Sequence, residues 1–186
     1  IGRALRHSGA CMISLKYNLV RLSWLSLLLL LGACAQQQPL PPQMPRLSLP
    51  VQLHVERHGQ GETDHWLLVI QQEGAALRWS MLNPLGVPLA RQLLLDGRWQ
   101  ADGLLPPNAE ARTLFAALLF ALSPDEQLEE LYADSAWTLH QNGRSLADDG
   151  STWHVRYLEK GGFELDVGPT LTYRVAPIAP AGARQQ

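Results

Sequence analysis

Hydrophobic and polar residues alternate along most of the chain after Pro50. The alternation begins at Val51, Leu53 and Val55, and further runs centre on Leu68, Trp79, Leu139, Val155, Leu165 and Tyr173. A period of two is the pattern of a strand with one buried face. Pairs such as Asp96-Gly97 and Asn142-Gly143 lie between runs and suit tight type I′ turns. We therefore predict a mainly β (α+β) domain, a meander that curls into an open antiparallel β-barrel.

Residues 108–132 break this alternation. Asn108 is a good N-cap, and residues 113–122 are apolar almost all round, so the stretch predicts a helix that must be buried. Ser123 and Glu126 have the spacing of a capping box for a second helix. Because the apolar helix is inserted in mid-sheet, we expect it inside or across the mouth of the barrel, as a plug or lid.

An apolar run from Leu22 to Leu31 precedes the sheet pattern. Lys16 and Arg21 come before it, and Leu31-Gly32-Ala33-Cys34, at its end, resembles a bacterial lipobox. The uncharged run is ten residues long, against about 18 for a membrane-spanning helix. We therefore predict that residues 1–33 are a signal peptide. Residues 1–11, ahead of Met12, then represent upstream sequence or a misplaced start.

The lipobox resemblance implies covalent acyl chains on Cys34 and attachment to a membrane. Ala35 rather than Asp follows this cysteine, which favours the periplasmic face of the outer membrane. Residues 34–50 are predicted to form a lipidated, proline-rich tether, extended at about 3.1 Å per residue and reaching roughly 50 Å. The folded domain is expected over 51–176, with a flexible tail over 177–186.

Net charge and cysteine content limit the classes of binding partner and the cross-links expected for this chain. Four of the 15 basic residues precede Cys34 while all 17 acidic residues follow it, so the remaining chain has a net charge of about −6. This argues against nucleic acid and against a polybasic membrane patch. Cys11 and Cys34 are the two cysteines, one removed and one lipidated, so no disulfide is expected. We expect a monomer.

The stretch from Leu77 to Val87 resembles LolB, an outer-membrane lipoprotein that receives lipoproteins from a periplasmic carrier and inserts them. The Asn83-Pro84-Leu85-Gly86 element is the sharpest match, and the likeness spans most of residues 51–176. The chain looks even more like a set of small uncharacterised lipoproteins related to LolB, which can accompany gene clusters for aryl-polyene lipids. The fold implied is a LolA/LolB-like incomplete barrel whose helices cover an apolar cavity for acyl chains.

Two sets of site residues follow from this resemblance. Leu85, with Pro84 and Gly86, would form an exposed loop that delivers lipid to the membrane; an ordinary turn with Leu85 in the core is the alternative. The candidate cavity lining consists of seven large apolar residues: Trp66, Trp79, Trp99, Leu118, Phe120, Trp137 and Trp153. The alternative for these is a solid barrel filled by its own side chains.

Little in the sequence indicates catalysis. No nucleophile-elbow, P-loop or zincin motif is present, and no enzyme, metal or cofactor is expected beyond the acyl chains. His54 and His58 are four apart, about 13 Å along a strand, which is too far for a chelate; His65, His140 and His154 are expected on the exposed face. Arg91 alternates with Leu89 and Leu93, so it is either an inward contact for a polar client group or the mark of a strand edge or bulge.

The leading hypothesis is therefore an outer-membrane-anchored protein that binds an acylated lipid or lipoprotein and acts in its transfer or insertion. A periplasmic carrier could supply the client, and the protein would act by stoichiometric binding. The alternative is a structural or assembly lipoprotein of the envelope, with a solid barrel and no lipid cargo.

Overall fold

The computed structural model describes residues 38–59, 61–148, 151–159 and 161–178. Ten strands in this part of the chain form one antiparallel sheet with the order β5-β4-β3-β2-β1-β10-β9-β8-β7-β6. The strands are β1 (Val51–His58), β2 (Asp64–Glu73), β3 (Ala76–Leu82), β4 (Pro88–Leu95), β5 (Arg98–Ala101), β6 (Ala136–His140), β7 (Gly143–Asp148), β8 (Ser151–Tyr157), β9 (Phe163–Val167) and β10 (Leu171–Pro177).

Two five-stranded meanders meet at the centre of this sheet. Val55 of β1 lies opposite Trp66 of β2 on one side and opposite Val175 of β10 on the other. The outermost strands, β5 and β6, each have a single neighbour in the sheet. The predicted mainly β, antiparallel meander with inserted helices is therefore confirmed, but the sheet is not closed into a barrel.

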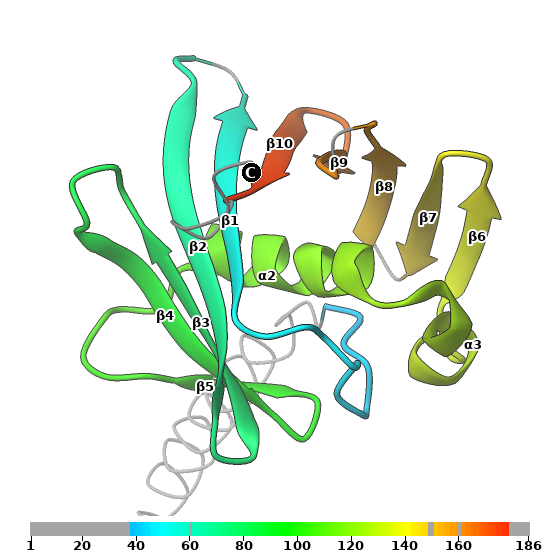
Figure 1. Cartoon of the computed structure of the whole chain (residues 1–186), viewed down its shortest axis with the longest axis horizontal. Helices are drawn as coiled ribbons and strands as arrows, with labels where there is room; N and C mark the ends of the chain where they lie inside the picture. Colours follow the sequence, from blue (N-terminus) through cyan, green and yellow to red (C-terminus); the bar gives the residue numbers. More distant parts are fainter. Residues whose placement is uncertain (1–37, 60, 149–150, 160, 179–186) are drawn as a thin grey trace, which may run out of the picture. The chain divides into compact units, whose positions relative to one another are not determined.

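The period of two sorts the side chains onto two faces. Val55, Leu68, Trp79, Leu165 and Val175 are buried on the face that we call inner, and their neighbours in sequence lie on the outer face. The inner residues share one hydrophobic core with the helical insert. Figure 1 shows the sheet bending around helix α2 (Ala109–Leu122), which crosses the inner side.

The helical insert begins as predicted and ends differently. Asn108 caps α2 by accepting a hydrogen bond from the Ala111 N–H at 3.0 Å. The predicted capping box at Ser123 is wrong, because the Ser123 N–H and hydroxyl both donate to Leu119 O at the end of α2. The second helical piece is short: a 3₁₀ turn η1 (Asp125–Gln127) continues into α3 (Leu128–Leu131).

The two glycine turns singled out in the sequence have different geometries. Asp96 and Gly97 have φ of 49° and 66°, as a type I′ turn requires. Asp96 is the one non-glycine residue with positive φ in the described part of the chain, so Asn142-Gly143 does not form the predicted type I′ turn. Gly143 is needed for a different reason: a Cβ there would lie 2.0 Å from Val155 O.

Residues 38–50, which we call the strap, do not form the extended spacer that proline content predicts. Gln38 Nε2 donates to Thr113 Oγ1 of α2 at 2.9 Å, and the Arg46 N–H donates to Gln127 Oε1 at 3.0 Å. The strap's apolar side chains pack against the core, namely Leu40, Met44, Leu47 and Leu49. These contacts give the segment a surface to bury its leucines, so it belongs to the same compact unit as the sheet. The predicted signal peptide (1–33) and lipidated Cys34 lie outside the described residues.

Candidate functional site

The concave side of the sheet is occupied by an unusually apolar helix. Nine of the 14 residues of α2 are buried, including the continuous run from Leu114 to Ala121. A sheet can cover only one side of a helix, and the strap supplies further contacts through Gln38. Because α2 is enclosed on more than one side, its amphipathic character is slight. The helix is thus the largest single piece of the hydrophobic core.

The residues predicted to line a cavity all lie in or against this core. Trp79, Trp153, Leu118 and Phe120 are fully buried, while Trp66, Trp99 and Trp137 are partly buried against them. Their rings contact α2 and one another. Ring centroids lie 5.4 Å apart for Trp79 and Phe115, 5.8 Å for Trp79 and Trp99, and 6.2 Å for Phe120 and Trp153. A ligand could therefore reach the fully buried indoles of Trp79 and Trp153 only after the core around α2 had opened.

The first turn of α2 is held by polar contacts that we call the N-terminal clamp (Arg57, Glu110 and Tyr173). Glu110 Oε1 accepts a hydrogen bond from Arg57 Nε at 2.5 Å and another from the Tyr173 hydroxyl at 3.0 Å. A carboxylate in the first turn also opposes the positive end of the helix dipole. Burial, and then the Glu110 carboxylate, raise the pKa of Tyr173 above its usual range.

The last turn of α2 is held by the C-terminal clamp (Arg144 and Tyr157). The buried Arg144 Nη1 donates to Phe120 O at 2.9 Å and to Ser123 O at 2.8 Å, and Nη2 pairs with Asp125 Oδ1 at 2.9 Å. The Tyr157 hydroxyl donates to Ala121 O at 2.7 Å. These donors satisfy carbonyls that a helix end leaves unpaired, and the arginine charge suits the negative end of the dipole.

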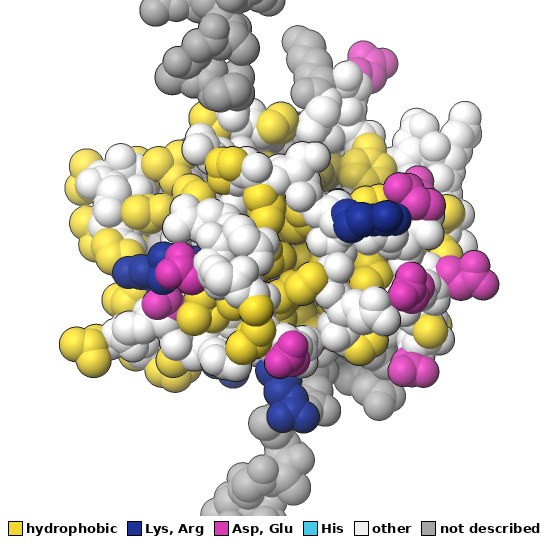
Figure 2. Space-filling view, turned by 60° about the horizontal axis from the view of Figure 1, so that its bottom comes forward, with side chains coloured by type: hydrophobic (Ala, Val, Ile, Leu, Met, Phe, Trp, Pro, Cys, Tyr) yellow, Lys and Arg dark blue, Asp and Glu magenta, His cyan; other side chains and the backbone are white. Residues whose placement is uncertain are grey.

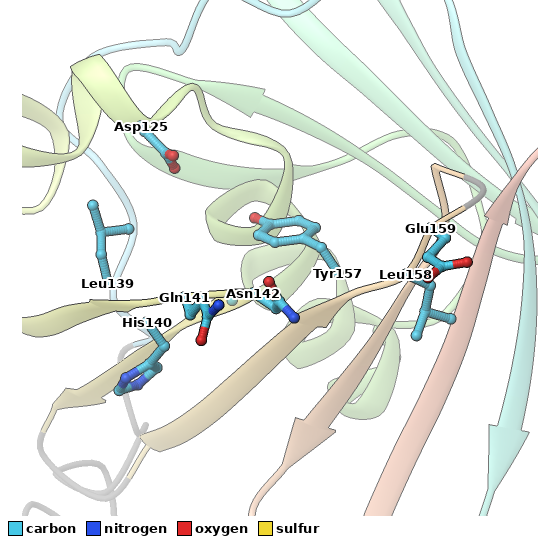
Figure 3. Close-up of a pocket in the computed structure, with 9 residues that line it drawn as sticks. Asp125, Leu139, His140, Gln141, Asn142, Tyr157, Leu158 and Glu159 are labelled. Atoms are coloured by element: carbon cyan, nitrogen blue, oxygen red, sulfur yellow. The ribbon is translucent and has the colours of Figure 1, made fainter.

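A surface pocket adjoins the C-terminal clamp. It has a volume of about 490 Å³ and is lined by Asp125, Tyr157 and the hairpin residues 139–143, with Leu158 and Glu159 (Figure 3). Burial raises the pKa of Tyr157 to about 12, with Arg144 acting against this rise. The Tyr157 phenol therefore stays neutral and remains a donor to the helix at ordinary pH.

A small polar cluster lies within the apolar inner face of β3, β4 and β5. Trp79 lies directly opposite Gln92, and Trp99 follows on β5. Trp79 Nε1, Gln92 Oε1 and Trp99 Nε1 are buried and have no hydrogen-bond partner among the described residues. A buried polar group without a partner costs about 1–3 kcal/mol, so these three groups are ones that a polar group of a ligand could pair.

The Pro84-Leu85-Gly86 element forms a three-residue hairpin loop between β3 and β4. The Gly86 N–H donates to Asn83 O at 2.9 Å, and Gly86 has φ of 80°, the geometry of a turn followed by a glycine bulge. Asn83 Oδ1 accepts from the N–H groups of Leu85 and Val87 at 3.0 and 2.9 Å. Leu85 is 87% exposed and Val87 52% exposed, so of the two alternatives the exposed loop holds.

Arg91 is not an inward residue. On β4 the buried positions are Ala90, Gln92 and Leu94, so Arg91 lies on the outer face. There its Nη2 pairs with Asp102 Oδ2 at 3.0 Å, and Arg78 Nε donates to the same oxygen at 2.8 Å. The prediction failed because the outer face of β4 also carries leucines, so alternation with apolar residues did not identify the inner face.

Hydrophobic side chains gather on one face of the domain. Figure 2 shows them over much of that view, including its centre and its left margin, interrupted by other side chains and backbone. No helix within the described residues combines the length and apolarity needed to cross a membrane.

The clamps and the polar cluster were not identified from the sequence, whereas the loop and the apolar helix were.

Comparison with known proteins identifies a family but no activity. A search of curated proteins gives no match to the chain. A family model described as a protein of unknown function, DUF3261, matches residues 50–175. Because the match covers more than half of the chain, this protein belongs to the DUF3261 family.

Proposed function

We propose that this protein is an outer-membrane-anchored, LolB-like lipoprotein that binds an acylated lipid or lipoprotein and acts in its transfer or insertion. The observation that carries the proposal is α2, an apolar helix enclosed by an open sheet and held at each end by side chains from β1, β7, β8 and β10. The buried surface of this helix is apolar, as are the acyl chains that would replace it.

The proposed mechanism is an exchange of contacts. Moving α2 outward breaks the clamps, each hydrogen bond of which contributes about 0.5–1.5 kcal/mol. Acyl chains that then contact the inner face gain about 0.8 kcal/mol per buried CH₂, or roughly 10 kcal/mol for a dozen such groups. The apolar burial that α2 loses is of the same order, since each buried Leu or Phe contributes about 1.5–3 kcal/mol. The acyl contacts therefore replace the helix contacts, so that an empty domain stays closed and a client opens it. Binding is stoichiometric and involves no turnover.

The polar cluster gives the proposed site a means of orienting its client. Acylated lipids carry ester or amide groups, which both accept and, for amides, donate hydrogen bonds. The indole N–H groups of Trp79 and Trp99 are donors, and Gln92 Oε1 is an acceptor. A client amide placed between β3, β4 and β5 would pair the indole donors through its carbonyl and Gln92 Oε1 through its N–H, whereas an ester would pair the indoles alone.

The exposed loop and the lipobox fit the delivery step of this proposal. Leu85 and Val87 project from a hairpin whose backbone is fixed by Asn83. Insertion of these side chains into a bilayer would bring the client to the membrane surface. A protein anchored through Cys34 stays at one membrane, which suits a recipient or inserter and not a shuttle between two.

The test uses a chain that starts at Gln38, which retains the described core and lacks the acyl chains of Cys34. Native mass spectrometry and a fluorescent fatty acid measure binding. Tyr157→Phe removes the hydrogen bond to Ala121 O, so it should raise the open fraction, and with it the apparent fatty-acid affinity, about fivefold for a bond worth about 1 kcal/mol.

The matched control is Thr172→Val, which removes a hydroxyl that donates to Asp166 Oδ1 at 2.6 Å on the outer face. It should reduce stability without changing fatty-acid affinity. Gln92→Leu should weaken the affinity for an amide-containing lipid while leaving the affinity for an ester-containing lipid or a plain hydrocarbon unchanged. Absence of any acyl binding, in the parent chain and in Tyr157→Phe, would reject the proposal.

One observation favours a second function. The inner aromatic rings contact one another and α2, as in a solid core. The protein would then be a structural or assembly lipoprotein of the envelope that acts through its surface. In that case Tyr157→Phe and Thr172→Val would reduce stability alike, and neither would bind fatty acid.

A further inference from the structure

A group of potential metal ligands lies on the outer face of the central strands. His54 and Glu56 occupy alternate positions of β1, and His65 of β2 lies directly opposite Glu56. These three side chains each offer one ligand atom, and the three atoms lie within 4.8 Å of one another. The spacing of His54 and His58 along β1 is not what brings ligands together. The second imidazole comes from β2, and it is the pairing of β2 with β1 that places it beside His54 and Glu56.

The distance between the two imidazoles matches that required by a tetrahedral zinc ion. His65 Nδ1 lies 3.4 Å from His54 Nε2. The two rings are stacked with planes 7° apart, so one ring would turn for both nitrogens to point at the ion. Zn²⁺ binds imidazole nitrogen at about 2.0–2.1 Å, which places two nitrogens of one tetrahedral site about 3.4 Å apart. Glu56 Oε1 lies 3.9 Å from His54 Nδ1, the ring nitrogen that does not face His65. One ligand atom of each residue lies within 4.8 Å of the other two, so the Glu56 side chain would turn toward the imidazole pair to reach the same ion.

The neighbouring side chains leave Glu56 available and support its position. His58 Nε2 lies 3.6 Å from Glu56 Oε2, the other carboxylate oxygen, and Thr63 Oγ1 lies 3.4 Å from His58 Nδ1. Arg174 lies opposite Glu56 on β10, but its guanidinium pairs with Glu164 Oε1 at 3.0 Å. The Arg174 charge is therefore paired with Glu164, which Arg156 also contacts.

We infer that His54, Glu56 and His65 bind a divalent transition-metal ion, with Zn²⁺ as the best fit to two imidazoles and one carboxylate. His58 acts as a positioning residue for Glu56. The ion joins β1 to β2 on the face opposite α2, so this site is separate from the proposed acyl-binding side. With three protein ligands, one coordination position remains for water or for a donor from a partner.

Isothermal titration of the full-length protein with Zn²⁺ alone tests the site. The parent chain should bind one equivalent, and Zn²⁺ should raise its melting temperature. His65→Ala and Glu56→Gln should each weaken binding at least tenfold, since loss of even an outer-shell partner commonly costs 10–100-fold. His58→Ala should weaken binding less than His65→Ala.

The matched control is His154→Ala, an exposed outer-face histidine of β8 that is not in the cluster. It should bind Zn²⁺ as the parent chain does. Co²⁺ substitution should give the visible absorption of a tetrahedral ion in the parent chain and lose it in His65→Ala. The inference is overturned if the parent chain shows no binding at Zn²⁺ concentrations up to about 100 μM, or if His65→Ala and His154→Ala bind Zn²⁺ with equal affinity.

Discussion

Arg144 of β7 contacts Phe120 of α2 in two ways: Nη1 donates a hydrogen bond to the phenylalanine carbonyl at 2.9 Å, and the guanidinium lies 5.5 Å from the ring centroid. The same arginine also binds Ser123 O and Asp125. The fold therefore couples a strand of the second meander to the C-terminal end of a helix that packs against both meanders. This coupling makes the position of α2 depend on a few polar contacts.

Replacement of Arg144 should measure that dependence. Arg144→Met keeps most of the apolar stem but leaves the carbonyls of Phe120 and Ser123 without their donor. Each buried unpaired group costs about 1–3 kcal/mol, so we expect a loss of about 2–4 kcal/mol in the free energy of unfolding. Urea unfolding checks this. Arg144→Lys, which keeps the charge without the fork of donors, should lose less. A change below about 0.5 kcal/mol in Arg144→Met would contradict the role of the clamp.

The C-terminal clamp should also give the protein a characteristic sensitivity to alkaline pH. Burial raises the pKa of Tyr157 to about 12, whereas a tyrosine in the unfolded chain titrates near pH 10. Between these values the unfolded state has lost the proton and the folded state has kept it. Stability is therefore fully present below about pH 10 and falls as the pH rises toward 12.

Melting temperatures measured between pH 8 and 12 test this expectation. Tyr157→Phe removes one titrating group, so its stability should decline less steeply above about pH 10 than that of the parent chain. The buried Tyr173 has its pKa shifted in the same direction, so some decline should persist in the variant. Identical slopes for the two proteins would show that Tyr157 does not contribute.

Parts of the fold could be predicted from the sequence. Asn108 and the almost wholly apolar run over 113–122 predicted α2, and the period of two predicted the strands. The alternation places both clamp arginines on the inner face, since Arg57 has the parity of Val55 and Arg144 that of Leu146. Their partners were not predictable, because they lie on or next to the helical insert, 53 and 24 residues away. Arg91 failed for a different reason. The outer face of β4 is partly apolar, so alternation alone could not tell the two faces apart.

The strap shows that proline content alone does not predict whether a segment packs against the domain. Five prolines in residues 35–50 predicted an extended chain, but proline content does not say whether the leucines between them find a surface. Leu40 and Met44 do so, because they pack against the core. One feature of the sequence did indicate packing: large apolar residues recur between the prolines, and a freely solvated spacer does not need them.

The strap should therefore stabilise α2. In the double variant Leu40→Ser/Met44→Ser, two partly buried side chains lose their apolar contacts, which should cost about 1–3 kcal/mol. The strap should become more sensitive to limited proteolysis, and fatty-acid uptake should accelerate if α2 moves as proposed. Gln43→Ser, at an exposed position of the same segment, is the control and should change none of these. Unchanged proteolysis in the double variant would mean that these contacts are not stabilising.

Leu85 should separate membrane contact from folding. Because this side chain is 87% exposed, Leu85→Ser should change the free energy of unfolding by no more than about 0.5 kcal/mol. Burial of a leucine in lipid yields about 1.5–3 kcal/mol, so the same variant should bind neutral phospholipid vesicles about tenfold more weakly. The chain that starts at Gln38 is used, so that no acyl anchor contributes to vesicle binding.

Leu104→Ser provides the matched comparison for Leu85→Ser, because Leu104 is fully exposed but lies outside the hairpin loop. If membrane contact is made by the Pro84-Leu85-Gly86 element, vesicle flotation should be reduced in Leu85→Ser and unchanged in Leu104→Ser. Equal reductions would mean that binding depends on exposed apolar area in general. Unfolding of Leu85→Ser would show that the loop has a structural role, which its hydrogen bonds to Asn83 do not require of the leucine side chain.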